Sequence, residues 1–185
     1  MVLAVYAYGH PVLKKVGEDI DKDYPALEEL ISNMWETMYN AKGVGLAAPQ
    51  IGLSIRLFLV DTIQIQEEGE EAKGIKKVFI NAEILEEGGE ETSYQEGCLS
   101  IPDIHGDVER PDQVKIRYMD EAFNEKIEIF EGFNARVIQH EYDHIEGILF
   151  TEYLKPLKKR RIKRKLEDIK TGKHRADYKM KFVKL

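Results

Sequence analysis

Two histidines one helical turn apart constrain the fold of this chain more than any other feature. In the stretch VIQHEYDHIEG, residues 137–147, His140 and His144 stand four positions apart and Glu141 follows the first of them. Positions i and i+4 of a helix lie on one face about 5–6 Å apart, so the two imidazoles can bind one divalent cation. A carboxylate at Glu141 can then reach a water on that cation. The pattern predicts a metal-binding helix.

The same stretch indicates where this helix lies. Val137, Ile138 and Ile145 are apolar, which fits a helix partly buried in the core. A buried pair of histidines without partners costs free energy, and a metal ion removes that cost. The alternative is an exposed helix face that happens to be rich in histidine and glutamate.

A catalytic metal ion usually has three protein ligands and one open position. Downstream of His144, the spacings of Glu146, Glu152 and His174 match no familiar pattern. Upstream, Cys98 lies in YQEGCLSIP, and a thiolate is a strong ligand for iron or zinc. Two other interpretations of Cys98 remain open at this point. It can be a small buried apolar residue, or a nucleophile paired with a histidine.

Apolar periodicity and turn residues predict an α+β fold in a single domain. An amphipathic helix is expected at residues 23–41, with Asp23 as its cap and Gly43 as its stop. The helix of the two histidines should end near Gly147. Expected strands cover residues 55–60, 77–85, 114–119 and 126–130, with a hairpin turn at 120–124 and an exposed acidic loop at 64–74.

Charge divides the chain into two parts. Residues 155–185 hold 14 Lys and Arg against 3 Asp and Glu, and residues 1–154 hold 13 against 31. We therefore expect a catalytic region at 1–154 and a basic C-terminal helix or tail at 155–185, either within the same domain or extending from it. A basic segment of this kind can dock on a polyanion, or it can simply be a solvated helix.

Composition favours the cytoplasm. The chain has one cysteine, which cannot form an internal disulfide, and this suits a reducing compartment. No apolar run approaches the roughly 20 residues of a membrane-spanning helix, and the opening MVLAVYAYGHPVL lacks the features of a signal peptide. We expect no membrane partner.

Three short segments together resemble the peptide deformylase family. They are GVGLAAPQ at 43–50, EGCLS at 96–100 and QHEYDH at 139–144, and they occur in the family's order. The resemblance extends over roughly residues 5–155. It implies antiparallel and mixed β-sheets packed around the metal-binding helix, with an N-terminal helix and a basic C-terminal helix.

The resemblance also implies an activity, the hydrolytic removal of the formyl group from the N-terminal formyl-methionine of newly made proteins. Cys98, His140 and His144 would hold one divalent metal ion, Fe²⁺ in the cell, with Zn²⁺, Ni²⁺ and Co²⁺ also suited to these ligands. A metal-bound water would attack the formyl carbon, with Glu141 as general base and then acid. Gln50 and the backbone N–H of Leu99 would donate to the oxyanion.

A substrate cleft follows from the same resemblance. Gly43 and Gly45 would let an extended peptide approach the backbone, and Gly97 would flank Cys98 in a tight segment. Glu96 would accept a hydrogen bond from the amide of Gln50, or it is a solvated loop carboxylate. Independently of the resemblance, Asp143 is not needed as a metal ligand, and we expect it to form an ion pair with Arg110. The walls of an apolar methionine slot would be Val44, Tyr94, Phe133 and Val137.

Some features depart from the family or leave alternatives. His105 stands where many members carry an arginine, and the acidic loop at 64–74 looks like an insertion without an assigned role. The basic tail would dock at the ribosome through phosphate attraction, without reading base sequence. Two other hypotheses are a metallopeptidase and an RNA-binding module with a structural metal. Structural sites normally have four protein ligands, and three are found here.

Overall fold

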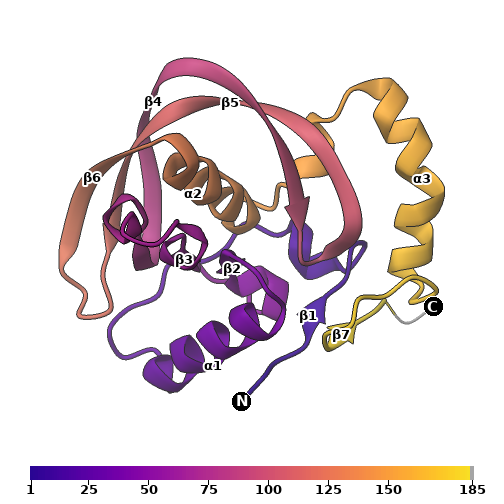
Figure 1. The fold of residues 1–185 in the computed structure, drawn as a ribbon. Helices are drawn as coiled ribbons and strands as arrows, with labels where there is room; N and C mark the ends of the chain where they lie inside the picture. The colour runs from indigo at the N-terminus through magenta and orange to yellow at the C-terminus, as the bar shows by residue number, and fades with distance from the viewer. Residues whose placement is uncertain (184–185) are drawn as a thin grey trace.

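The helix of the two histidines lies at the centre of the fold. The computed structural model describes residues 1–183. In Figure 1, the long strands β4 (Lys76–Cys98) and β5 (Ile101–Met119) curve over helix α2 (Gly132–Ile145). Helix α1 (Leu27–Asn40) lies on the opposite side of α2, and helix α3 (Pro156–Lys170) stands at the edge. The expected α+β class is confirmed.

Two sheets build this frame. The larger is antiparallel, in the order β2-β3-β4-β5-β6, and adds β2 (Gly45–Ala47), β3 (Leu57–Asp61) and β6 (Glu125–Glu131) to the two long strands. The smaller is a parallel pair of β1 (Val5–Tyr6) and β7 (Met180–Lys181). Short 3₁₀ helices connect these elements: η1 (Pro11–Lys14), η2 (Ala48–Ile51), η3 (Ile63–Ile65), η4 (Glu71–Lys73) and η5 (Phe150–Tyr153).

β4 and β5 are much longer than the apolar pattern predicts. Four register shifts interrupt their pairing, one of them between Gly88 and Glu91, and such irregularities bend a strand pair and increase its twist. The expected end of β4 at residue 85 is therefore wrong. Most side chains from 85 to 95 are exposed on both faces of the ribbon, so the sequence there lacks the alternation that reveals a half-buried strand.

The predicted start of α1 is also wrong. The side chain of Asp21 accepts a hydrogen bond from the backbone N–H of Asp23 at 2.9 Å, which forms a turn where the helix was expected. Ala26, at φ 52°, then precedes the first helical residue. At the other end, the N–H of Gly43 closes the helix by donating to Met38 O at 2.9 Å, while Lys42 takes the left-handed conformation at φ 57°.

Helix α2 is buried as its sequence predicts. Ile138 and Ile145 are fully buried, and Val137 is 5% exposed. These side chains pack with Phe58, Phe79 and other residues of the large sheet. The helix ends at Ile145, and the expected stop lies two residues later at Gly147, whose φ of 72° is readily adopted only by glycine. The turn at 120–124 is confirmed as well, because Asp120 N–H donates to Asn124 O at 3.0 Å.

The basic C-terminal part packs against the body of the protein. Ile162 and Ile169 of α3 lie in an apolar cluster with Ile101 and Ile104 at the start of β5. After α3 the chain reverses, and β7 pairs with β1. Within residues 1–183, no helix combines the length and apolar character that crossing a membrane requires.

The packing of α3 can be tested by removing one buried side chain. Ile169 is fully buried, so Ile169→Ala should lower the free energy of unfolding by about 2–5 kcal/mol. The matched control is Leu157→Ala on the same helix, where the side chain is 59% exposed and the change should stay within about 0.5 kcal/mol. Urea unfolding measures both. Equal stability of the two variants would mean that α3 does not belong to the cooperative domain.

Candidate active site

A hairpin and a helix bring three metal-ligating side chains together. Cys98 ends β4, and it pairs with Ile101 at the start of β5 across a two-residue turn. His140 and His144 project from α2 toward this turn. One ligand atom from each of the three residues lies within 4.8 Å of the others, and Cys98 Sγ is 3.4 Å from His144 Nε2. The structure thus places the three predicted ligands in one cluster.

The cluster suits a divalent metal ion. An ion bound at about 2.0–2.3 Å by tetrahedral ligands keeps those ligand atoms roughly 3.3–3.8 Å apart. The Cys98–His144 separation of 3.4 Å falls in this range. The ligand atom of His140 lies within 4.8 Å of the other two, close enough to bind the same ion. Glu141 Oε2, beside the cluster, is buried and has no hydrogen-bond partner within the described residues. Two imidazoles, a thiolate and an unpartnered buried oxygen fit a metal site with room for water.

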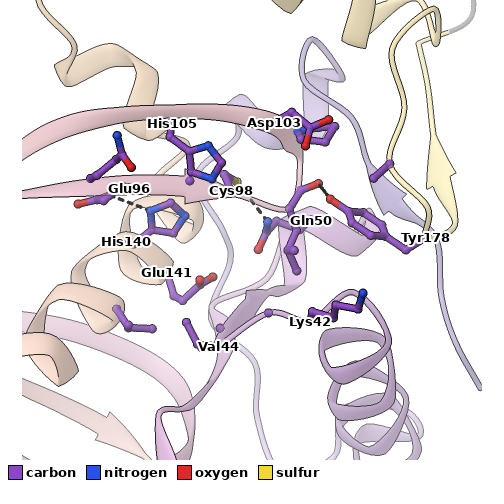
Figure 2. A pocket seen from close by; sticks show the side chains of 18 of the residues that line it. Lys42, Val44, Gln50, Glu96, Cys98, Asp103, His105, His140, Glu141 and Tyr178 are labelled. Atoms are coloured by element: carbon purple, nitrogen blue, oxygen red, sulfur yellow. Dashed lines mark hydrogen bonds and ion pairs between the residues drawn. The ribbon is translucent and has the colours of Figure 1, made fainter. Parts of the chain in front are cut away.

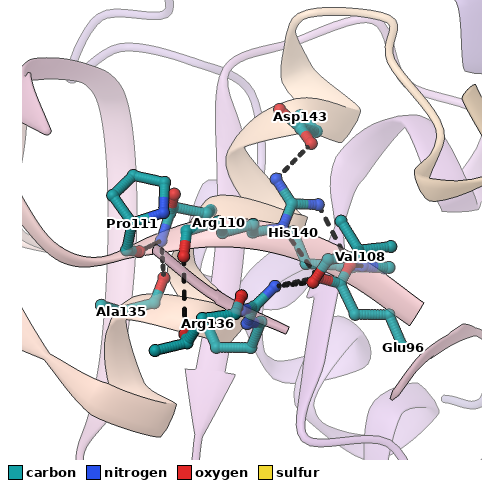
Figure 3. Close-up of polar contacts among 10 residues, drawn as sticks. Glu96, Val108, Arg110, Pro111, Ala135, Arg136, His140 and Asp143 are labelled. Carbon is teal, nitrogen blue, oxygen red and sulfur yellow. Dashed lines mark hydrogen bonds and ion pairs between the residues drawn. The ribbon is translucent and has the colours of Figure 1, made fainter. Parts of the chain in front are cut away.

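Glu96 orients one of the two histidines. Its Oε1 accepts a hydrogen bond from His140 Nδ1 at 2.9 Å, which leaves Nε2 of that ring facing the cluster. Figure 3 shows Glu96 at the centre of a buried network. Its carboxylate also accepts hydrogen bonds from Arg110 Nε at 2.7 Å and from Arg136 Nη1 at 2.9 Å. Burial raises the pKa of Glu96, but the hydrogen bonds from His140 and Arg110 outweigh it and hold the pKa well below its usual range.

This network corrects the expected partner of Glu96. Gln50 does not donate to Glu96. Instead, Gln50 Nε2 lies 3.5 Å from Cys98 Sγ and donates to Ser100 Oγ at 3.3 Å, while its Oε1 accepts from Ala47 N–H at 2.9 Å. The two side chains flank Cys98 from opposite sides (Figure 2). The expected ion pair of Arg110 with Asp143 is present, with Nη1 donating to Oδ2 at 2.8 Å.

A cleft of about 600 Å³ opens over the cluster. All the residues expected to bind substrate line it, together with both oxyanion-donor candidates and Glu141. The expected residues are Gly43, Val44, Gly45, Tyr94, Glu96, Gly97, Phe133 and Val137. The rings of Tyr94 and Phe133 lie 5.4 Å apart at one wall. Gly97 lies against the ring of His105, which also lines the cleft.

The glycines at 43 and 45 allow close packing inside the site. A Cβ at Gly45 would lie 2.4 Å from Glu141 Oε1, and a Cβ at Gly43 would lie 2.8 Å from Leu99 Cδ1. Real Cβ atoms essentially never come within 3.0 Å of such neighbours, so a side chain at either position would displace Glu141 or Leu99. The two glycines therefore let β2 approach both the carboxylate of Glu141 and the turn that carries Leu99.

The carboxyl group of Glu141 has a raised pKa. It is 4% exposed, and burial raises its pKa to about 7. The nearby charge of His140 opposes this rise, and those of Glu96 and Asp143 add to it. A carboxyl with a pKa close to the working pH can both accept and release a proton.

Comparison with known proteins agrees with the residue pattern. The family model described as polypeptide deformylase matches residues 2–160. The chain belongs to this family. Peptide deformylase from Christiangramia forsetii is 57% identical over 98% of this chain and 96% of its own length. The crystal structure of the Legionella pneumophila enzyme superposes with a TM-score of 0.82 at 34% identity, over 95% of this chain and 99% of that one.

A third comparison involves an enzyme with a peptide bound. The structure of a class I type b peptide deformylase from Acinetobacter baumannii with Met-Ala-Ser has a TM-score of 0.74 and 35% identity. It matches 83% of this chain and 99% of its own. Deformylases are metal-dependent hydrolases that remove the formyl group from nascent peptides. Family membership thus decides against the metallopeptidase and the RNA-binding module.

The structure adds cleft residues that sequence reasoning missed. Some stand beside the recognised motifs, namely Lys42, Gln95, Pro102, Asp103 and Arg136. Lys42, Gln95, Pro102 and Asp103 lie within a few residues of GVGLAAPQ or EGCLS, and this closeness in the sequence could have indicated them. The others, Arg175 to Tyr178, come from the C-terminal segment. No local signal marks them, because their place depends on how the chain reverses after α3.

The role of Glu96 in orienting His140 predicts a loss of metal affinity. Glu96→Gln should weaken metal binding about 10–100-fold, since partners of this kind fix the orientation and basicity of a ligand. Competition with a chelator measures the affinity of folded protein, checked by circular dichroism. Glu109→Gln, an exposed glutamate on β5, is the control and should bind as the parent does. An unchanged affinity in Glu96→Gln would contradict the orienting role.

Proposed function

We propose that Cys98, His140 and His144 hold the single divalent metal ion with which this deformylase acts on N-formylmethionyl peptides. The convergence of the three ligand atoms within 4.8 Å beside a buried carboxylate carries the proposal. Fe²⁺ is the ion proposed for the cell, and Zn²⁺, Ni²⁺ and Co²⁺ also suit two imidazoles and a thiolate. When bound, such an ion lowers the pKa of water and polarises a carbonyl group.

Glu141 moves the proton in this proposal. Its carboxylate accepts a proton from the attacking water, and the new carbon–oxygen bond forms at the formyl carbon. Glu141 then delivers the proton to the nitrogen as the carbon–nitrogen bond breaks, which releases formate and the free amine. Burial raises the pKa of Glu141, and a cation beside the carboxylate would lower it again and favour the ionised form that accepts the proton.

Gln50 and Leu99 stabilise the negative charge on the formyl oxygen. Gln50 is 1% exposed, and the hydrogen bond that Ala47 N–H donates to its Oε1 turns its NH₂ group toward Cys98. Leu99 follows Cys98 directly, so its backbone N–H belongs to the same turn as the metal ligand. Donors fixed before the reaction stabilise the developing charge without reorganising.

The apolar wall of the cleft accommodates the methionine side chain. Val44 and Phe133 are partly buried against the cluster that contains Val137. Tyr94, 48% exposed, packs on Phe133 and lies nearer the solvent. These four side chains form the slot, and the Met-Ala-Ser reported with the Acinetobacter baumannii enzyme is a ligand of matching type.

The exposed face of α3 docks on the ribosome, in the cytoplasm where formylated chains emerge. Its buried face is fixed by Ile162 and Ile169, so the charged side chains point outward. The exposed basic residues are Lys155, Lys159, Arg160, Arg161, Lys163 and Arg164. Side chains of this kind bind a phosphate backbone by charge and do not identify bases.

Replacing the proposed proton carrier tests the mechanism. Glu141→Gln should lower kcat for formyl-Met-Ala-Ser by about 10²–10⁴-fold, because the amide cannot accept the proton. Formate release measures turnover, and elemental analysis should still find close to one metal ion per chain. Glu109→Gln again serves as control. Turnover near the parental rate in Glu141→Gln would refute the assignment.

Docking through α3 predicts a salt-sensitive loss of ribosome binding. A variant with Arg160, Arg161, Lys163 and Arg164 changed to Gln should cosediment less with ribosomes, and its binding should vary less with salt concentration. Formate release from formyl-Met-Ala-Ser should stay unchanged, since these residues lie outside the cleft. Equal cosedimentation of parent and variant would contradict docking by this face.

A further inference from the structure

The C-terminal segment of the chain reaches the edge of the cleft. After α3, Gly172 turns the chain at φ 75°, and residues 171–181 run back along the body as a return segment. Two hydrogen bonds fix its end, from Val5 N–H to Lys179 O and from Ala7 N–H to Lys181 O, both at 2.9 Å. Arg175, Ala176, Asp177 and Tyr178 of this segment line the cleft.

Tyr178 contacts the turn beside the metal-ligating cysteine. Its hydroxyl donates a hydrogen bond of 2.6 Å to the backbone oxygen of Leu99. Figure 2 shows this hydroxyl reaching the turn next to Gln50. The contact joins residues 79 positions apart. Tyr178 itself lies beyond residue 160, where the match to the family model ends.

Other contacts show that the turn is held on several sides. The carbonyl of Ser100, the next residue, accepts a hydrogen bond from Tyr8 N–H at 2.9 Å. Beyond it, Asp103 is held twice, by Lys165 Nζ at its backbone oxygen and by His174 Nε2 at its carboxylate, each at 2.8 Å. The return segment and α3 therefore anchor the hairpin that presents Cys98 and Leu99.

Tyr178 is the anchor that contacts Leu99, the residue next to Cys98. The turn between Cys98 and Ile101 has only two residues and is closed by strand pairing at both ends. The N–H and the carbonyl of Leu99 belong to the two peptide planes that meet at its Cα, and so tight a turn restricts the φ and ψ angles that relate these planes. A hydrogen bond that fixes the carbonyl also limits the direction of the N–H. Catalytic donors need placement to within about 0.5 Å and 10–20°.

We propose that Tyr178 is a positioning residue of the deformylase site, whose hydroxyl holds the Leu99 carbonyl and thereby aims the Leu99 N–H at the formyl oxygen. This rests on the proposed function in one respect, the assignment of the Leu99 N–H as an oxyanion donor. A purely structural Tyr178 would attach the return segment and leave the chemical step unaffected.

Removing the hydroxyl separates these roles. Tyr178→Phe keeps the ring and loses only the donor. The matched control is Tyr6→Phe, which also removes a contact of the return segment, since Tyr6 accepts a hydrogen bond from Lys181 Nζ at 3.0 Å away from the cleft. Full-length variants loaded with the same metal are compared on formyl-Met-Ala-Ser, and binding of the product Met-Ala-Ser is measured separately.

A positioning role predicts a defect confined to turnover. Tyr178→Phe should lower kcat about tenfold, less than the roughly 10²–10³ lost when a donor itself is removed. KM and the Kd for Met-Ala-Ser should change by less than about twofold, because interactions made only in the transition state do not affect ground-state binding. Tyr6→Phe should retain the parental kcat.

A second measurement is independent of turnover. Amide hydrogen exchange at residues 98–101 should be faster in Tyr178→Phe than in the parent and unchanged in Tyr6→Phe, because only the first variant frees the turn. Equal kcat values or equal exchange in the two variants would overturn the proposal. A parent enzyme that releases no formate would instead refute the proposed function.

Discussion

The site depends on one buried carboxylate, Glu96. It stands on β4 and joins three elements, because it accepts hydrogen bonds from Arg110 on β5 and from Arg136 and His140 on α2. Arg110 continues the network to Asp143, one position before His144. Breaking a buried ion pair by removing one partner typically costs about 3–5 kcal/mol, since a charge remains without compensation. The same contacts fix the angle between helix and hairpin, and therefore the distance between the thiol and the imidazoles.

Where the information is local, the sequence predicted which ligating side chains converge. The i and i+4 spacing of His140 and His144 requires only a helix, and Cys98 completed the set through its motif. The pairing of Arg110 with Asp143 also followed from charge. Glu96 was assigned the wrong partner, because its partners come from two other elements, β5 and α2. No spacing along the chain indicates whether this carboxylate meets an amide or a guanidinium.

In the fold as well, the features set by local sequence were predicted and those set by contacts between distant segments were not. α2 and its glycine stop were predicted from periodicity and turn chemistry. The long β4 and β5 were underestimated for different reasons. In β4, residues 85–95 are mostly exposed on both faces and carry no alternation. In β5, buried and exposed positions do alternate from 102 to 110, but Gly106 and Arg110 occupy buried positions and interrupt the apolar pattern. The start of α1 was misplaced because a side-chain turn at Asp21 competes with the helix. The return segment escaped prediction altogether, because only the tertiary structure brings it to Leu99.

The pairing of β1 with β7 has a consequence for how this protein comes to exist. Contacts between them join residues up to 175 positions apart, close to the full length of the chain. Pairs of such large sequence separation form late, after the cost of closing the intervening loop has been met. During synthesis, β7 leaves the ribosome long after the helix of the two histidines. An enzyme that acts on nascent chains thus completes the wall of its own cleft only after its own β7 has been synthesised.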